Sequence, residues 1–134
     1  MGDTPRTETV GTHRTCLERQ MHGYLKSFGF VQGRDFDEQY STPNGRVLDF
    51  ILQLRRKDGT VLSIDIETDG SPWHSSKSQT NRDGYRDKSM RSLGYVVVRF
   101  REPLDRMITY KLLRDAAQKN GASFPPFVPD QAGD

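Results

Sequence analysis

The stretch RVLDFILQLRRKDGTVLSIDIETD, residues 46–69, decides the fold. It holds two apolar, β-branched runs, 46–54 and 60–68, on either side of the turn Lys57-Asp58-Gly59. Such runs around a short turn that contains glycine are typical of a β-hairpin. The stretch therefore predicts two adjacent antiparallel strands, and further elements are expected on both sides of them.

Helical and extended patterns precede this hairpin. Apolar residues recur at helical spacing from Thr15 to Phe28, and Gly29 supplies a stop signal directly after them. Residues 35–41 suit a short edge strand, and the turn-forming sequence at 42–45 separates them from the hairpin. The sequence therefore predicts one helix and one strand ahead of the hairpin.

Downstream of the hairpin, the sequence predicts a helix, a strand and a second helix. A charged helix is expected over 82–94, and the apolar run YVVVRF, 95–100, is typical of a central buried strand. The last helix is expected from Leu104 to Ala117, with an apolar stripe formed by Met107, Ile108, Leu112 and Leu113. This order predicts an α/β (α+β) fold, with a mixed central β-sheet flanked by helices and a last strand entered from a helical crossover.

Length and composition restrict the class of protein. The 134 residues fit a single domain, and the formal net charge of +2 excludes a polybasic tail or an acidic solvating segment. The single cysteine, Cys16, excludes a disulfide framework or a Cys-rich zinc site within the chain. No apolar run approaches the roughly 20 residues that cross a bilayer, and the N-terminus has no hydrophobic signal core. We therefore expect a soluble, intracellular (cytoplasmic) protein with no membrane partner.

The chain divides into three segments by composition. Residues 1–12 are expected to be a flexible N-terminal segment, and 13–119 a single folded domain. Residues 120–134 form a tail rich in Pro and Gly, in which Phe124, Phe127 and Val128 could dock on the domain.

Acidic residues occupy one face of the second hairpin strand. Side chains alternate between the two faces of a strand, so Leu62, Ile64 and Ile66 share one face, which should be core. Asp65, Glu67 and Asp69 share the other face. Carboxylates buried together repel one another and lose hydration unless a cation lies among them. A solvent-facing sheet surface is the alternative interpretation.

A second acid and a histidine suggest where chemistry would occur. Asp49 lies within an apolar strand, where Asp is disfavoured, and hairpin pairing would bring it and Glu67 towards one hard cation such as Mg²⁺. His74 follows in a polar loop as a candidate for proton transfer, and Asp83 could orient its ring. Glu18, taken alone, is typical of the solvated face of a helix.

These residues resemble the PD-(D/E)xK nuclease superfamily. The runs GRVLDFIL, IDIETDGSPWH and NRDGYRDKSMRSLGYVVVRF are most similar to the very short patch repair endonucleases and the related EDxHD homing endonucleases. The resemblance spans roughly residues 14–101, and it implies a restriction-endonuclease-like core. It implies a metal-dependent endonuclease that hydrolyses phosphodiester bonds in double-stranded DNA, with Mg²⁺ as cofactor and Mn²⁺ as a substitute.

The resemblance also assigns roles to single residues. It implies a catalytic set made of Glu18, Asp49, Glu67, Asp69, His74 and Asp83. It implies metal binding by Asp49, Glu67 and the main-chain oxygen of Thr68, with His74 as general base and Asp83 as its partner. Asp69 falls where the superfamily usually has Lys and the repair enzymes have His. Leu48 replaces the Pro of the superfamily's name, and no structural zinc is expected, because the repair enzymes' Cys and His ligands are missing.

Basic and aromatic side chains around this set are the candidates for DNA contact. The nucleic-acid-binding set comprises Arg46, Trp73, Lys77, Arg82, Arg86 and Lys88. Arg55, Arg56, Lys57 and Arg91 are further basic candidates, although a run such as 55–57 is usually only a solvated turn. Because one small domain carries one active site, a double-strand cut would require a homodimer or two successive nicks.

Two other classes of function compete with the nuclease. The first is a catalytically silent nuclease-fold module that binds DNA or assists assembly, against which the intact acid set argues. The second is a hydrolase of small phosphoesters, which the lack of a Gly-rich phosphate loop disfavours.

Overall fold

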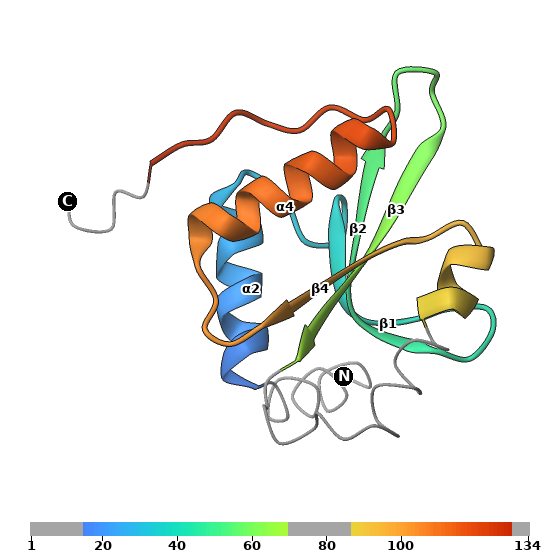
Figure 1. Cartoon of the computed structure of the whole chain (residues 1–134), viewed down its shortest axis with the longest axis horizontal. Helices are drawn as coiled ribbons and strands as arrows, with labels where there is room; N and C mark the ends of the chain where they lie inside the picture. Colours follow the sequence, from blue (N-terminus) through green and yellow to red (C-terminus); the bar gives the residue numbers. More distant parts are fainter. Residues whose placement is uncertain (1–14, 70–86, 130–134) are drawn as a thin grey trace, which may run out of the picture.

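The computed structural model describes residues 15–69 and 87–129 (Figure 1). Its elements are α2 (Cys16–Ser27), β1 (Phe36–Ser41), β2 (Val47–Arg55), β3 (Val61–Asp69), β4 (Val96–Arg101) and α4 (Arg106–Lys119). Residues 87–92 are also helical. The protein is therefore a mixed α/β structure, as the order of sequence patterns predicted. None of the helices in the two described ranges is long and apolar enough to cross a membrane.

The four strands form one mixed sheet in the order β1-β2-β3-β4. β1, β2 and β3 pair antiparallel, whereas β4 pairs parallel to β3. A parallel pair requires a crossover connection, and the helical residues 87–92 lie within that connection. The predicted hairpin and the predicted crossover into the last strand are both confirmed.

The two faces of the sheet carry clusters of different size. α2 and α4 lie together against one face (Figure 1), and the large core there includes Met21, Leu25, Phe50, Ile64 and Leu113. The other face carries a small cluster of Leu48, Ile51 and Met90, the last of these from the helical segment 87–92. Most apolar burial therefore lies on the α2 and α4 side, as the alternation in β3 predicted for Leu62, Ile64 and Ile66.

β4 differs from the predicted central strand. In the described part of the chain it forms an edge of the sheet, beside β3 alone. Val96, Val97 and Val98 are only partly buried, and Phe100 is the one fully buried side chain of the strand. The prediction was wrong because Val96 and Val98 pack on one cluster and Val97 on the other. An edge strand covered on both faces is as apolar in sequence as a central strand.

α4 buries a different stripe from the predicted one. Met107, Ile108 and Leu112 are 43%, 57% and 44% exposed, whereas Leu113 is fully buried. The buried face consists of Thr109, Tyr110, Leu113 and Ala117. Two neighbouring stripes of this helix are apolar, and the one with the larger aromatic side chain is buried. Tyr110 also donates a hydrogen bond from its hydroxyl to the carbonyl of Pro125 at 2.6 Å.

The segment after α4 packs back onto the helices. Phe124 and Phe127 make edge contacts with Tyr110, at 5.3 and 5.0 Å between ring centroids. The guanidinium of Arg106 lies 4.9 Å from the ring of Phe127 and 5.4 Å from that of Phe28. Phe124 and Phe127 therefore dock on the domain as considered from the sequence, whereas Val128 is 52% exposed.

Adjacent leucines in α4 provide a test of this packing. We expect Leu113→Ala to lower the free energy of unfolding by about 2–5 kcal/mol, because it removes a fully buried side chain and leaves a cavity. Leu112→Ala should cost less than about 1 kcal/mol, because Leu112 is 44% exposed. Urea denaturation of both variants measures the difference. Equal losses would contradict the observed face of the helix.

Candidate functional site

Acidic residues from three elements lie at one end of the sheet. Glu18 comes from the first turn of α2, Asp49 from β2, and Asp65 and Glu67 from β3. Paired residues of β2 and β3 run from Arg55↔Val61 to Phe50↔Ile66. Asp49 and Glu67 therefore follow the last pair, at the end of the hairpin remote from its turn.

Asp49 occupies a position where regular strand pairing stops. Its Oδ2 accepts a hydrogen bond from the backbone N–H of Thr68 at 2.8 Å and another from the Thr68 hydroxyl at 3.1 Å. On the other side, β1 and β2 pair as Glu38↔Phe50 and Tyr40↔Leu48, and Gln39 between them has a φ of 49°. The carboxylate thus takes the place of a backbone acceptor, which accounts for an aspartate inside an apolar strand.

Glu18 is buried rather than solvated, contrary to the sequence-based alternative. Its side chain is part of a capping box, in which Glu18 N–H donates to the Thr15 hydroxyl and Thr15 N–H donates to Glu18 Oε1. Gln39 Nε2 lies 3.5 Å from Glu18 Oε2. Burial raises the pKa of Glu18, and the negative charge of Asp49 raises it further. The capping pattern Thr15-x-x-Glu18 is the signal that could have predicted this position.

The carboxyl groups of Asp65 and Glu67 are removed from water together. Asp65 is only 2% exposed, and its Oδ1 has no hydrogen-bond partner among the described residues. Burial raises the pKa of Asp65. Burial, followed by hydrogen bonding and charge repulsion from Asp65, raises the pKa of Glu67 to about 10. The solvent-facing interpretation of this strand face is therefore wrong, and the pair retains a proton at neutral pH.

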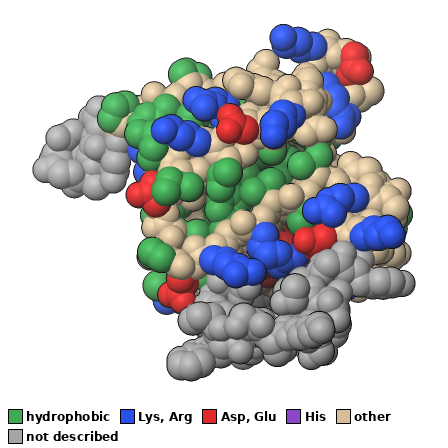
Figure 2. Space-filling view, viewed as in Figure 1, with side chains coloured by type: hydrophobic (Ala, Val, Ile, Leu, Met, Phe, Trp, Pro, Cys, Tyr) green, Lys and Arg blue, Asp and Glu red, His purple; other side chains and the backbone are tan. Residues whose placement is uncertain are grey.

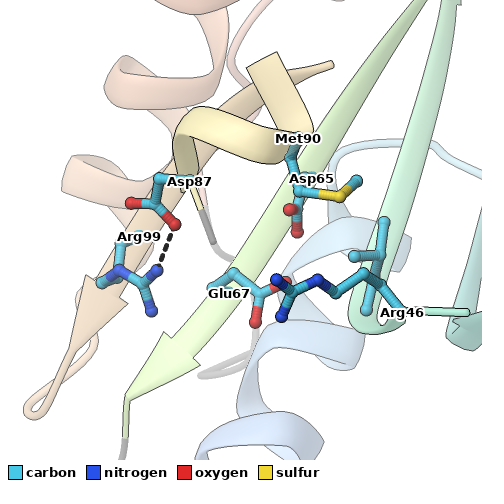
Figure 3. Close-up of a pocket in the computed structure, with 7 residues that line it drawn as sticks. Arg46, Asp65, Glu67, Asp87, Met90 and Arg99 are labelled. Carbon is cyan, nitrogen blue, oxygen red and sulfur yellow. Dashed lines mark hydrogen bonds and ion pairs between the residues drawn. The ribbon is translucent and has the colours of Figure 1, made fainter. Parts of the chain in front are cut away.

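A small pocket contains both of these carboxyl groups (Figure 3). Its lining includes Arg46, Asp65, Glu67, Asp87 and Arg99. Arg99 comes from β4 and lies opposite Glu67 in the parallel register. Its Nη2 forms an ion pair with Asp87 Oδ1 at 2.6 Å. Arg99 thus places a positive charge beside the buried acids. Arg46, predicted from the sequence as a DNA contact, lines the same pocket.

The predicted basic residues do not all lie near this pocket. Lys88 is exposed on the helical segment 87–92. Arg55 and Arg56 lie near the hairpin turn, roughly 20 Å from Asp49 at about 3.3 Å per strand residue. Arg56 is held there, because its Nε donates to the carbonyl of Asn120 at 2.8 Å. On the face of the molecule seen in Figure 2, Lys and Arg side chains are interspersed with acidic ones and do not form one continuous basic surface.

Several predicted site residues fall outside the described residues. These are Trp73, His74, Lys77, Arg82, Asp83 and Arg86. Asp69 ends β3 and pairs with Arg101, but its side chain is not described. Of the predicted set, the structure thus places Glu18, Asp49 and Glu67 at one end of the sheet, with Asp49 in electrostatic range of both glutamates.

The sequence did not single out Asp65, Asp87 or Arg99 as site residues. Strand alternation placed Asp65 on the acidic face, so a signal for it existed. Asp87 and Arg99 meet only through the crossover and the parallel register. No local pattern in the sequence reports that contact.

The carboxylate oxygens at this end of the sheet are the type of ligand that a hard cation prefers. Mg²⁺ is commonly bound by one or two carboxylates together with water and substrate oxygens. Asp49 and Glu67 could provide them, and the unpartnered Asp65 Oδ1 is a further buried oxygen. Among residues 15–69 and 87–129, no three His, Cys, Asp or Glu side chains are grouped closely enough to hold a metal ion by themselves.

Comparison with known proteins does not identify the chain. No protein-family model matches it, and no curated protein or solved structure matches it significantly. Because a fold by itself does not define a function, the chemistry of the site must carry the functional argument.

The raised pKa of Glu67 predicts how stability depends on pH. In the metal-free protein, folded Glu67 keeps its proton up to a pKa of about 10, whereas the unfolded side chain loses it near the ordinary glutamate pKa of 4.5. The free energy of unfolding should therefore fall as pH rises from about 5 to 9, by at most about 1.4 kcal/mol per pH unit for one proton.

Glu67→Gln provides the matched test of this pH dependence. The amide keeps the shape of the side chain and cannot ionise, so the variant should show a flatter profile and greater stability at about pH 8. Asp115→Asn, at an exposed site on α4, should leave the profile unchanged. Urea titrations in EDTA across this pH range measure all three proteins. A wild-type profile that rises with pH would contradict the raised pKa.

Proposed function

We propose that this protein is a metal-dependent DNA endonuclease with a restriction-endonuclease-like core. The observation that carries the proposal is the position of Glu18, Asp49 and Glu67, from three elements, at one end of a sheet, where the charge of Asp49 acts on both glutamates. Buried carboxyl groups with raised pKa values are costly to stability and are typical of functional sites. The proposed reaction is the hydrolysis of a phosphodiester bond with Mg²⁺, or Mn²⁺ in its place.

The order of elements supports the same proposal. A helix, three antiparallel strands, a crossover with a helical segment, a parallel strand and a helix follow one another. This order is compatible with the mixed central sheet flanked by helices that the resemblance to the PD-(D/E)xK nucleases implies. Asp49 lies on β2 and Glu67 on β3, the two strands of the hairpin.

In the proposed mechanism, Asp49 and Glu67 would hold the metal ion, and the main-chain oxygen of Thr68 would be a further ligand. The bound ion would polarise the scissile phosphate and stabilise the charge that develops on it. Thr68 fixes the Asp49 carboxylate through its N–H and hydroxyl. Glu18 acts behind Asp49 as a positioning residue that is itself fixed by the capping box.

The remaining proposed roles follow the resemblance. His74 would remove a proton from the attacking water, and Asp83 would orient the His74 ring. Asp69 would add a carboxylate on the phosphate side of the site. Double-stranded DNA would be held through phosphate contacts from Arg46 and Lys88, together with Trp73, Lys77, Arg82 and Arg86. A homodimer would allow both strands to be cut.

One observation favours the alternative, a catalytically silent DNA-binding or assembly module. Asp49 already satisfies the backbone N–H of Thr68, so this aspartate has a structural role whether or not a metal binds. In a silent module, removing its charge would leave the interaction with DNA unchanged. The two functions therefore differ in the effect of neutralising Asp49.

Cleavage of supercoiled plasmid in Mg²⁺ or Mn²⁺ tests the nuclease directly. We expect nicking or linearisation by the wild type, none in EDTA, and a loss of at least about 100-fold in Asp49→Asn and Glu67→Gln. Asparagine retains an oxygen that can accept from Thr68, so Asp49→Asn should stay folded. Glu67→Gln should be more stable than the wild type, because it removes a buried ionisable group. It should nevertheless be inactive, because it also removes the carboxylate charge that would bind the metal ion.

The controls separate catalysis from binding and from contamination. Asp115→Asn carries the same charge change far from the cluster and should cleave at the wild-type rate. His74→Ala tests the proposed base. If the wild type binds DNA without cutting it, and Asp49→Asn binds equally well, the nuclease is excluded and the silent module is favoured.

Metal binding can be measured without DNA. We expect millimolar Mn²⁺ to raise the melting temperature of the wild type, because a ligand that binds only the folded state stabilises it. Asp49→Asn should abolish this increase, and Asp115→Asn should retain it. Differential scanning calorimetry with Mn²⁺ and with EDTA provides the measurement. An equal increase in all three proteins would place any bound metal elsewhere.

A further inference from the structure

Arg99 and Asp87 form an ion pair at the edge of the pocket (Figure 3). Arg99 Nη2 and Asp87 Oδ1 are 2.6 Å apart, and the side chains are 24% and 19% exposed. Both residues line the pocket that contains Glu67. Because the pair is partly accessible to solvent, another anion can compete with Asp87 for Arg99.

Two arginines approach Glu67 from opposite sides. Arg99 lies on β4 directly opposite Glu67, and Arg46 lies directly before β2 on the other side (Figure 3). Both guanidinium groups therefore border one position beside Glu67, where Arg99 already faces the carboxyl groups of Asp65, Glu67 and Asp87. Guanidinium groups bind carboxylate and phosphate in the same planar, bidentate manner.

We propose that the space between Arg46 and Arg99 is a phosphate-binding subsite, and that the Asp87 carboxylate occupies its Arg99 side in the free protein. The inference rests on the proposed function for the identity of the ligand, a phosphate group of double-stranded DNA. A phosphate entering the pocket replaces Asp87 as a partner of Arg99. Asp87 thus lowers the affinity for anions and stabilises the pocket while it is empty.

The pocket, with a volume of about 10 Å³, can admit a phosphate only if the Asp87 carboxylate leaves it. Asp65 and Glu67 provide acidic oxygens on its floor, and an incoming phosphate brings more negative charge. The positive charges of Arg46 and Arg99 are the features of the lining that favour an anion. As long as Asp87 neutralises Arg99, one of the two arginines is compensated within the protein. Removing the Asp87 charge should therefore improve phosphate binding, whereas removing a residue with a purely structural role should not.

Binding of a short fluorescein-labelled DNA duplex, measured by anisotropy in EDTA, tests the proposal. Arg99→Met should weaken binding about tenfold and reduce the slope of log K against log salt by about 1 between about 50 and 200 mM NaCl. Asp87→Asn should strengthen binding about three- to tenfold. Arg99→Lys, which keeps the charge and loses the planar fork, should fall between the wild type and Arg99→Met.

Asp115→Asn is the matched control, because it changes the net charge equally and releases Arg114 from an ion pair on α4. It should change DNA affinity less than about twofold. Inorganic phosphate should raise the melting temperature of Asp87→Asn more than that of Asp115→Asn. The proposal is overturned if Asp87→Asn binds DNA no more tightly than Asp115→Asn, or if Arg99→Met binds as the wild type does. Because EDTA prevents metal-dependent cleavage, the expected binding pattern in a protein that never cuts DNA would support the subsite and refute the nuclease.

Discussion

The arrangement of the site depends on the hydrogen bonds that Thr68 donates to the Asp49 carboxylate. Regular pairing of β2 with β3 stops at Phe50↔Ile66, and beyond that point a side chain, rather than a backbone carbonyl, accepts the Thr68 N–H. This contact fixes the end of β3 against β2, and Glu67 is the residue directly before Thr68. A charged acceptor makes the hydrogen bond stronger than a neutral one. One carboxylate therefore both ends the strand pairing and determines where the neighbouring acids lie.

Concentrating acids at this end of the sheet lowers the stability of the fold through charge repulsion and lost hydration. The protein offsets this loss of stability in two ways. Glu67 remains protonated, as its raised pKa requires, so that part of the repulsion is removed without a counterion. Arg99 and Arg46 provide positive charge at the same pocket. A buried carboxyl group kept neutral by a proton is also one that a metal ion can ionise. The features that limit the cost in the free protein are thus compatible with cation binding, which is why we favour a catalytic function over a purely structural one.

The sequence predicted the strands well because their signals are local. Alternation in β3 identified the core residues Ile64 and Ile66, and the lone acid in β2 identified Asp49. The errors occurred where tertiary packing chose between equivalent local patterns. In α4, two apolar stripes were available, and contacts of Tyr110 with the segment after the helix selected one of them. The pairing of Arg99 with Asp87 depends on the parallel register of β4, which is determined by a crossover and not by any short motif.

The unequal faces of the sheet explain how such a site is tolerated. The face covered by α2 and α4 contains nearly all of the large buried side chains, and Phe124 and Phe127 extend this core beyond the last helix. At the opposite end of the hairpin, Arg56 ties the strands to the end of α4. Apolar burial on that side stabilises the fold, so the other face needs only the small cluster around Leu48, Ile51 and Met90. That face also holds the buried carboxyl groups of Asp65 and Glu67 and the ion pair of Arg99 with Asp87, the groups on which the proposed phosphate site depends.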